Sequence, residues 1–133
     1  MKKAKSKKKK PSISRLKKKL DAVFSEWVRR SQDCCFTCGK VEHWKDAQAG
    51  HFISRTFTCV RWNDMNVNRQ CVSCNVFKHG NMVEYWLAME KKYGREIIDW
   101  LNDIKRKPFK LHTSWLEEQI EFYRLKILEM SSN

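Results

Sequence analysis

The chain has 133 residues, a formal net charge of +13, six cysteines and 41% hydrophobic residues. This length favours one domain with a modest core over two independent domains. No run of about 18 apolar residues could span a membrane, and no apolar segment follows the basic start as a secretion signal would require. We therefore expect a cytoplasmic protein, in which reduced cysteines bind metal more often than they form disulfides.

The positive charge is concentrated at the N-terminus. Residues 1–20 contain eleven of the 28 lysines and arginines and no acidic residue, which leaves 17 basic and 15 acidic side chains for the rest of the chain. Residues 1–11 ("MKKAKSKKKKP") have nothing to bury and repel one another, which predicts a disordered lysine-rich arm. We expect the arm to contact nucleic acid phosphates; a tail that only improves solubility is the alternative.

Residues 12–133 are expected to form a single domain. After Ser12, a suitable N-cap, apolar side chains recur at helical spacing and predict an amphipathic helix that ends near Arg30. Residues 50–57 predict a strand, and residues 60–71 predict a turn that leads into a second, short strand. Four helices should follow: a short one from Val72, one over residues 81–93 that Gly94 stops, one over 95–106, and one from a capping box at Ser114 and Glu117 to about Met130.

The first and last predicted helices have apolar seams of the same spacing. The first seam comprises Ile13, Leu16, Leu20, Val23 and Trp27, and the last comprises Leu116, Ile120, Tyr123, Ile127 and Met130. The seams predict that the two helices pack together within one chain. The alternative is a seam between two chains, which leaves a homodimer open.

Two pairs of cysteines have the spacing of a zinc site. Cys35 and Cys38 form one C-x2-C pair and Cys71 and Cys74 form another, with 32 residues between the pairs. Structural zinc needs four tetrahedral ligands, which two such pairs supply. We predict a structural Zn²⁺ at the base of a long insertion. Cys34 is a less well spaced alternative to Cys35.

Three further residues stand around the second cysteine pair. His51 lies in "AGHF", Asn66 precedes Cys71 by five residues, and Asn75 directly follows Cys74. With Lys78, the pattern GHF…N-x4-C-x2-C-N-x2-K resembles the HNH, or ββα-metal, nuclease motif. The order of "CFTCG", "AGHF", "RWNDMN", "QCVSCN" and "KHGN" resembles, more narrowly, the NinG/Rap family of phage recombination proteins over roughly residues 35–100.

The resemblance implies an α+β fold with a zinc-stapled ββα-metal core over about residues 34–80 and helical flanks at 12–31 and 81–130. It implies a divalent-metal-dependent endodeoxyribonuclease, made by a phage in its bacterial host, that hydrolyses branched recombination intermediates such as Holliday junctions or D-loops. His51 would be the general base, Asn66 would orient the loop and the histidine ring, and Asn75 would offer its carbonyl oxygen to Mg²⁺ or Mn²⁺.

The residue before His51 departs from the nuclease pattern. Many HNH enzymes carry an acidic metal ligand at this position, which is Gly50 here. Asp46 is the nearest replacement and Gln48 is a weaker oxygen donor. His79 has no assigned role and is expected to act as a nitrogen ligand or as a contact to phosphate.

The expected DNA contacts around the site are Arg55, Arg61, Arg69 and Lys78. A second hypothesis, which Gly50 favours, is a non-catalytic zinc-containing module that binds DNA or a partner protein in recombination. A zinc protein that associates with RNA or the ribosome is a third, but it leaves the His51, Asn66 and Asn75 combination unexplained.

Overall fold

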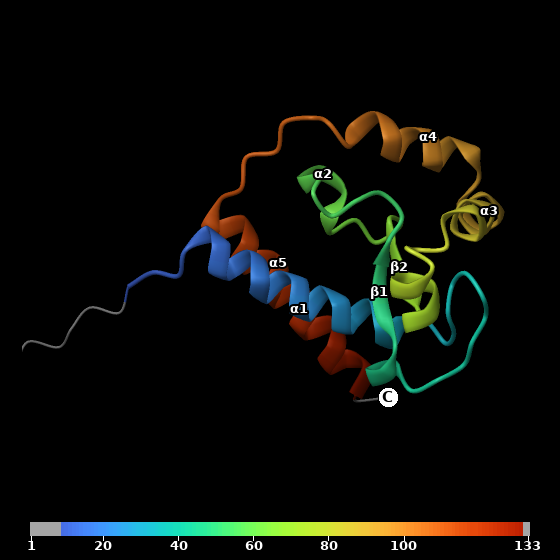
Figure 1. Ribbon diagram of the computed structural model, residues 1–133. Helices are drawn as coiled ribbons and strands as arrows, with labels where there is room; N and C mark the ends of the chain where they lie inside the picture. Colours follow the sequence, from blue (N-terminus) through green and yellow to red (C-terminus); the bar gives the residue numbers. More distant parts are fainter. Residues whose placement is uncertain (1–8, 132–133) are drawn as a thin grey trace, which may run out of the picture.

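The computed structural model describes residues 9–131, so most of the arm expected over residues 1–11 lies outside the described part of the chain. In chain order the elements are α1 (Ile13–Ser31), the 3₁₀ helix η1 (Trp44–Asp46), β1 (Gln48–His51), α2 (Thr58–Arg61), β2 (Val67–Gln70), the π-helical turn η2 (Ser73–Phe77), α3 (Met82–Tyr93), α4 (Arg95–Ile104) and α5 (Thr113–Ser131) (Figure 1). The strands pair antiparallel in the register Gln48↔Gln70, Ala49↔Arg69, Gly50↔Asn68 and His51↔Val67. The predicted α+β class is confirmed.

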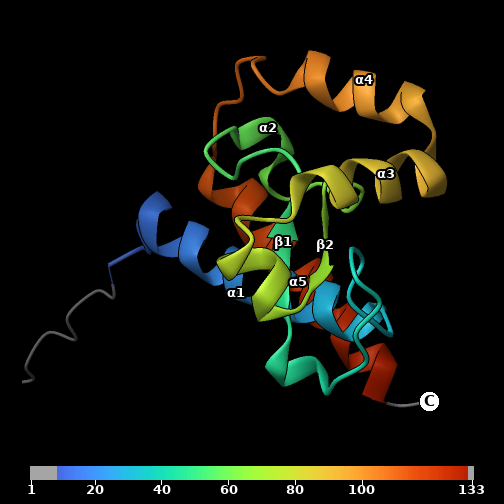
Figure 2. The ribbon, with the colours of Figure 1, turned by 45° about the vertical axis from the view of Figure 1, so that its right-hand side comes forward.

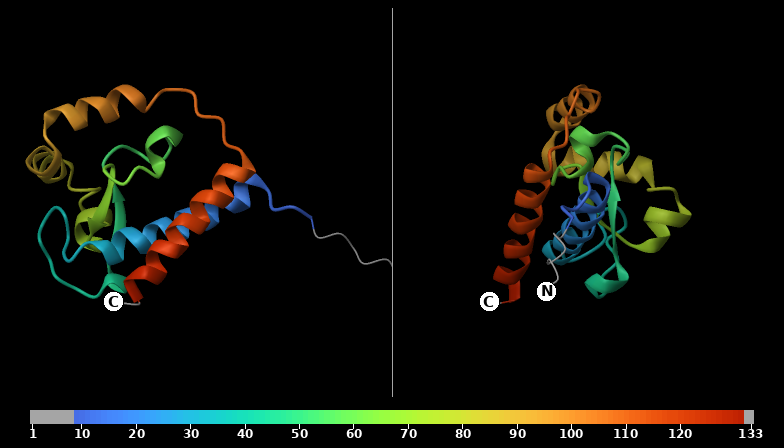
Figure 3. Two further views of the ribbon diagram at one scale, coloured as in Figure 1. Left: turned by 180° about the vertical axis from the view of Figure 1, so that it is seen from behind. Right: turned by 90° about the vertical axis from the view of Figure 1, so that its left-hand side faces the viewer.

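Helices α1 and α5 pack side by side and run in the same direction (Figures 1 and 3). α1 begins after Ser12, whose hydroxyl accepts a hydrogen bond from the Arg15 amide. Between the helices, the rings of Phe24 and Tyr123 meet edge to face with centroids 4.9 Å apart. The buried core here comprises Leu16, Leu20, Phe24, Val28, Trp62, Val67, Leu116 and Tyr123. The two seams therefore meet within one chain, as predicted.

The two-stranded sheet lies between two helical layers (Figure 1). Ala49 and Val67 turn one face of the sheet toward the α1–α5 core. On the other face, the buried Tyr85 hydroxyl of α3 donates a hydrogen bond to the Gly50 carbonyl at 2.7 Å. A second core joins α2, α3 and α4 and comprises Val60, Tyr85, Met89, Ile98 and Leu101.

The first strand is shorter than predicted. Only Gly50 and His51 of the expected strand 50–57 pair with β2. Beyond His51, the Asn66 side chain accepts a hydrogen bond from the Ile53 amide and donates one to the Ile53 carbonyl. Because the Asn66 side chain hydrogen-bonds the amide and the carbonyl of Ile53, these two groups cannot pair with β2. The predicted end of the first strand is therefore wrong.

Two predicted helix starts also need correction. The short helix expected from Val72 is a π-helical turn, in which the Lys78 amide bonds the Ser73 carbonyl five residues earlier at 2.9 Å. α5 begins at Thr113, so Ser114 lies inside the first turn and is not the N-cap. Gly94, with φ +86°, ends α3 as predicted. Within the described residues, no helix combines the length and the apolar character needed to cross a membrane.

One carboxylate ties α1 to the loop between the strands. Asp21 accepts hydrogen bonds from the Arg61 guanidinium and, at 2.9 Å, from the Trp62 indole N–H. The Arg61 side chain is 12% exposed, so water screens its charge little and Asp21 is its counter-charge. The Asp21 carboxylate thus pairs with Arg61 and also accepts the hydrogen bond of the buried Trp62 indole. These bonds fix the position of the Arg61 backbone relative to α1.

We predict that Asp21→Asn lowers the free energy of unfolding by about 2 kcal/mol, because the substitution leaves the shielded Arg61 guanidinium without its counter-charge. Urea denaturation followed by circular dichroism measures the change. The control is Asp99→Asn, which removes the exposed pair of Arg95 and Asp99 and should have a much smaller effect. Equal losses in both variants would show that Asp21 has no special structural role.

Candidate functional site

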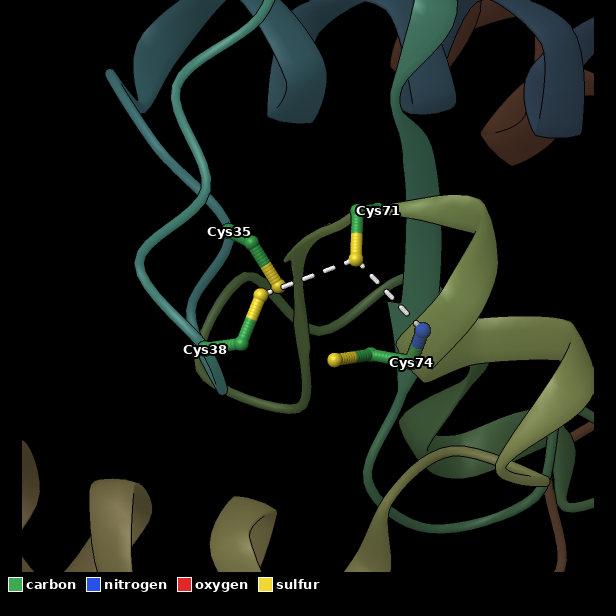
Figure 4. A group of neighbouring side chains, drawn as sticks. All are labelled: Cys35, Cys38, Cys71 and Cys74. Carbon is green, nitrogen blue, oxygen red and sulfur yellow. Dashed lines mark hydrogen bonds between the residues drawn. The ribbon is translucent and has the colours of Figure 1, made fainter.

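Four cysteines from two separate segments meet at the base of the hairpin (Figure 4). The sulfur atoms of Cys35, Cys38, Cys71 and Cys74 all lie within 4.8 Å of one another. The Cys38 and Cys71 Sγ atoms are 3.7 Å apart. Tetrahedral zinc with bonds of about 2.3 Å separates its sulfur ligands by about 3.8 Å. The predicted ligand set is therefore assembled, with Cys34 outside it.

The turn that carries the first two cysteines closes at Gly39, directly after Cys38. Gly39 has φ +79°, a left-handed conformation that disfavours other residues, and its amide bonds the Cys35 carbonyl at 2.9 Å. Burial raises the pKa of the Cys35 thiol, but hydrogen bonds from the Thr37 hydroxyl and from backbone groups outweigh it and bring the pKa to about 6. One sulfur is thus favoured as thiolate, the form that binds metal.

His51 lies at the end of β1, with its ring anchored to the following loop. Its Nε2 is 2.9 Å from the Arg61 carbonyl oxygen. A carbonyl only accepts, so Nε2 carries the proton and Nδ1 of the neutral ring keeps the lone pair. Burial lowers the pKa of His51, against the opposing effects of the Arg61 carbonyl and the Asp21 carboxylate. The ring is therefore neutral near pH 7.

Asn66 is fully buried and serves the same loop from its far end. Its amide bonds both backbone groups of Ile53 and donates to the Val60 carbonyl at 3.0 Å. The expected orientation of the loop is thus observed. The expected hydrogen bond from Asn66 to the His51 ring is not formed. The ring instead bonds the Arg61 carbonyl.

Asn75 and His51 line one open hollow of about 360 Å³. Its walls come from β1, the loop after β1 and the turn that follows the second cysteine pair: Ala49, His51, Ser54, Arg55, Asn75, His79, Gly80 and Met82. Asn75 Nδ2 donates to Gln48 Oε1 at 2.7 Å, which leaves Asn75 Oδ1 as the acceptor end of the amide. A histidine nitrogen, an amide oxygen and a guanidinium thus share this hollow.

His79 enters the hollow from a strained turn. His79, Gly80 and Asn81 all have positive φ, at 51°, 92° and 50°. Non-glycine residues adopt this conformation rarely, and such positions gather at functional sites. The Gly80 amide bonds the Cys74 carbonyl at 2.9 Å, which ties the turn to the cysteine cluster.

Packing leaves no room for a side chain at Gly50, the position at which many HNH enzymes carry an acid. A Cβ on Gly50 would lie 1.8 Å from the Oε1 of Gln70, whose side chain is fully buried. Gln70 Nε2 donates to the Gly80 carbonyl at 2.9 Å and to the Thr37 hydroxyl, so the glutamine cannot easily move away. Asp46 does not replace the missing acid in the hollow. It lies in η1, before β1 begins, whereas His51 ends that strand.

The four residues expected to contact DNA divide into two groups. Arg69 is buried and donates to the backbone carbonyls of Arg29, Gln32 and Glu42, so the expectation that it contacts DNA is wrong. Arg61 is engaged by Asp21 and contributes its carbonyl to the site. Arg55 and Lys78 are exposed, and Arg55 lines the hollow.

Lys18 was not singled out by the sequence, where it is one of many lysines. It lies on α1 and lines a second hollow, which also includes Asp21, His51 and Arg55. His51 therefore stands between two open hollows, each with a cationic side chain in its wall. Only the periodicity of α1, which turns Lys18 away from the α5 seam, could have indicated this placement.

Comparison with known proteins agrees with the narrower of the two resemblances, the one to the NinG family. The chain matches the family model described as NinG, bacteriophage lambda NinG protein, over residues 1–132. Protein ninG of Escherichia phage lambda is 32% identical over 94 residues, which cover 68% of this chain and 45% of that protein. Protein ninG of Salmonella phage P22 is 30% identical over 102 residues, which cover 73% and 49%.

The chain thus spans about half the length of these curated relatives. No solved structure matches it. Because the family model covers nearly the whole chain, including the cysteine cluster and the hollow at His51, the chain belongs to the bacteriophage NinG family.

Proposed function

We propose that this protein is a metal-dependent endonuclease that hydrolyses branched DNA recombination intermediates. The observation that carries the proposal is the single hollow lined by His51, Asn75, His79 and Arg55. These residues offer a base, neutral metal ligands and a cation for phosphate, the three parts that phosphodiester hydrolysis needs. The resemblance of the sequence to HNH nucleases supports the same assignment of roles.

His51 acts as the general base. Its Nε2 is fixed on the Arg61 carbonyl, so Nδ1 is the atom that takes a proton from the attacking water. The water oxygen forms a bond to phosphorus, the bond from phosphorus to the 3′ oxygen breaks, and the leaving oxygen acquires a proton from solvent. The products are a 5′-phosphate and a 3′-hydroxyl. Arg55 faces the phosphate oxygens.

Asn75 Oδ1 and an imidazole nitrogen of His79 would hold the divalent cation. An amide oxygen suits Mg²⁺ and Mn²⁺ alike, but a nitrogen ligand favours a transition metal, so this donor set fits Mn²⁺ better than Mg²⁺. When bound, the cation supplies Lewis-acid stabilisation of charge on the phosphate and the leaving oxygen. Bound zinc at the four cysteines would hold the Asn75–His79 turn in place from the other side.

A non-catalytic DNA-binding module is the second candidate. The observation that favours it is chemical: of the described residues that line the hollow with Asn75, none carries a carboxylate. Without an anionic ligand, metal affinity depends on neutral donors and on the phosphate itself. The two candidates agree on DNA binding and differ in whether DNA is cut.

We expect His51→Ala to reduce cleavage of synthetic four-way junctions by at least 100-fold in the presence of Mn²⁺, because the water loses its base. Gel analysis of nicked products measures this. The control is His112→Ala, which changes an exposed histidine next to α5 and should cut normally. Since burial lowers the pKa of His51, the acid limb of the wild-type pH profile should lie below pH 6.5. Binding without cleavage under any divalent ion would support the second candidate.

Asn75→Ala should raise the Mn²⁺ concentration needed for half-maximal cleavage, whereas Asn75→Asp should lower it by adding an anionic oxygen at the same place. A metal titration of the cleavage rate tests both. Asn102→Ala, on the exposed face of α4, is the control and should match wild type. A metal requirement that is the same in all three variants would remove Asn75 from the metal site.

Purified protein should contain one zinc per chain, and chelation should unfold the domain, because structural zinc contributes on the order of 10 kcal/mol to folding. Elemental analysis and circular dichroism measure the two effects. Cys71→Ser should abolish zinc binding, whereas Cys34→Ser and Cys59→Ser should retain it, since their sulfurs lie outside the cluster. Full zinc content in Cys71→Ser would overturn the assignment.

A further inference from the structure

The turn beside the hollow presents an apolar tip to solvent. Phe77 is 75% exposed and Val76 is 48% exposed, although both residues are large enough to be expected in a core. Lys78 follows directly and is exposed as well. The right-hand view of Figure 3 shows this yellow-green turn at the edge of the molecule, away from the α1–α5 pair, and Figure 2 shows it in front of α1.

Several bonds prevent the turn from folding its aromatic tip inward. Cys74, on the buried side of η2, belongs to the cysteine cluster. The Asn75 amide bonds the Cys71 carbonyl and the Gly80 amide bonds the Cys74 carbonyl, both at 2.9 Å. The left-handed residues 79–81 then carry the chain into α3. Phe77 is therefore held outward by a closed, hydrogen-bonded loop.

The position of Phe77 relative to the hollow identifies its partner. Asn75 and His79, which line the hollow with His51, lie two residues to either side of Phe77. Phe77 itself does not line the hollow, so DNA with a phosphate in the hollow would reach this tip where it leaves the hollow across the turn. Residues 71–81 include Lys78 and no acidic side chain, so the tip is complementary in charge to a polyanion.

We propose that Phe77 is a wedge that stacks against an unstacked base at the branch point of the DNA. Aromatic and aliphatic side chains inserted at a base step must open the stack, which costs free energy in a continuous duplex. A branch point already interrupts stacking and exposes base faces, so the wedge binds there without this cost. The inference rests on the proposed function, because it explains how the nuclease selects branched DNA.

Fluorescence of 2-aminopurine placed beside the branch of a four-way junction tests the wedge, with Ca²⁺ in place of Mn²⁺ so that binding is measured without cleavage. Wild type should increase the fluorescence. Phe77→Ala should abolish the increase and weaken junction binding on the order of tenfold, while Phe77→Trp should retain both. Binding to linear duplex should change less than about twofold.

The matched control is Val83→Ala, which removes a 74% exposed apolar side chain from α3. It should leave the fluorescence and the affinity unchanged, and every variant should keep its zinc content. If Phe77→Ala behaves as wild type while wild type still cuts junctions, the wedge is rejected and the nuclease stands. If wild type cuts nothing but Phe77→Ala loses the fluorescence change, the wedge stands and the nuclease is rejected.

Discussion

The arrangement of the site depends on the meeting of four sulfur atoms at the base of the hairpin. Cys71 directly follows β2 and Cys74 directly precedes Asn75, so both lie just before the turn that carries the candidate ligands. The Gly80 amide bonds the Cys74 carbonyl from the far end of that turn. The same cluster draws in residues 35–38, which would otherwise lie on a long loop. A metal ion bound by the four sulfurs would crosslink these segments, which would let a short sheet and a five-residue turn hold functional groups rigidly.

The sequence predicted the features that local chemistry determines. The cysteine spacing predicted the cluster, and apolar periodicity predicted the α1–α5 pair, because both depend on repeated residue types at fixed intervals. The end of β1 could not be predicted, because it depends on a side chain at Asn66 that is distant in sequence and takes the backbone bonds of Ile53. Arg69 was misread for a related reason, since three backbone carbonyls from the segment before β1 surround its guanidinium.

Gly50 shows how packing can decide the chemistry of a site. The sequence alone marks it as a missing acid, whereas the structure shows that Gln70 occupies the space a side chain would need. Gln70 in turn holds the Gly80 carbonyl, and Gly80 belongs to the turn that brings His79 into the hollow. The position before His51 and the turn that carries His79 are therefore both held by contacts with Gln70.

The distribution of positive charge follows from the same structure. With Arg69 buried and Arg61 paired, Arg55 and Lys18 are the cationic side chains that line the two hollows at His51 within the described residues. Lys18 lies five residues after the start of α1, about 8 Å along the helix, and the lysine-rich segment precedes that start directly in sequence. The lysine-rich segment thus joins the domain at the end of α1 that carries Lys18. The acidic side chains Glu117, Glu118 and Glu121 of α5 line a separate hollow, so the positive charge beside His51 and the negative charge of α5 lie on different surfaces of the domain.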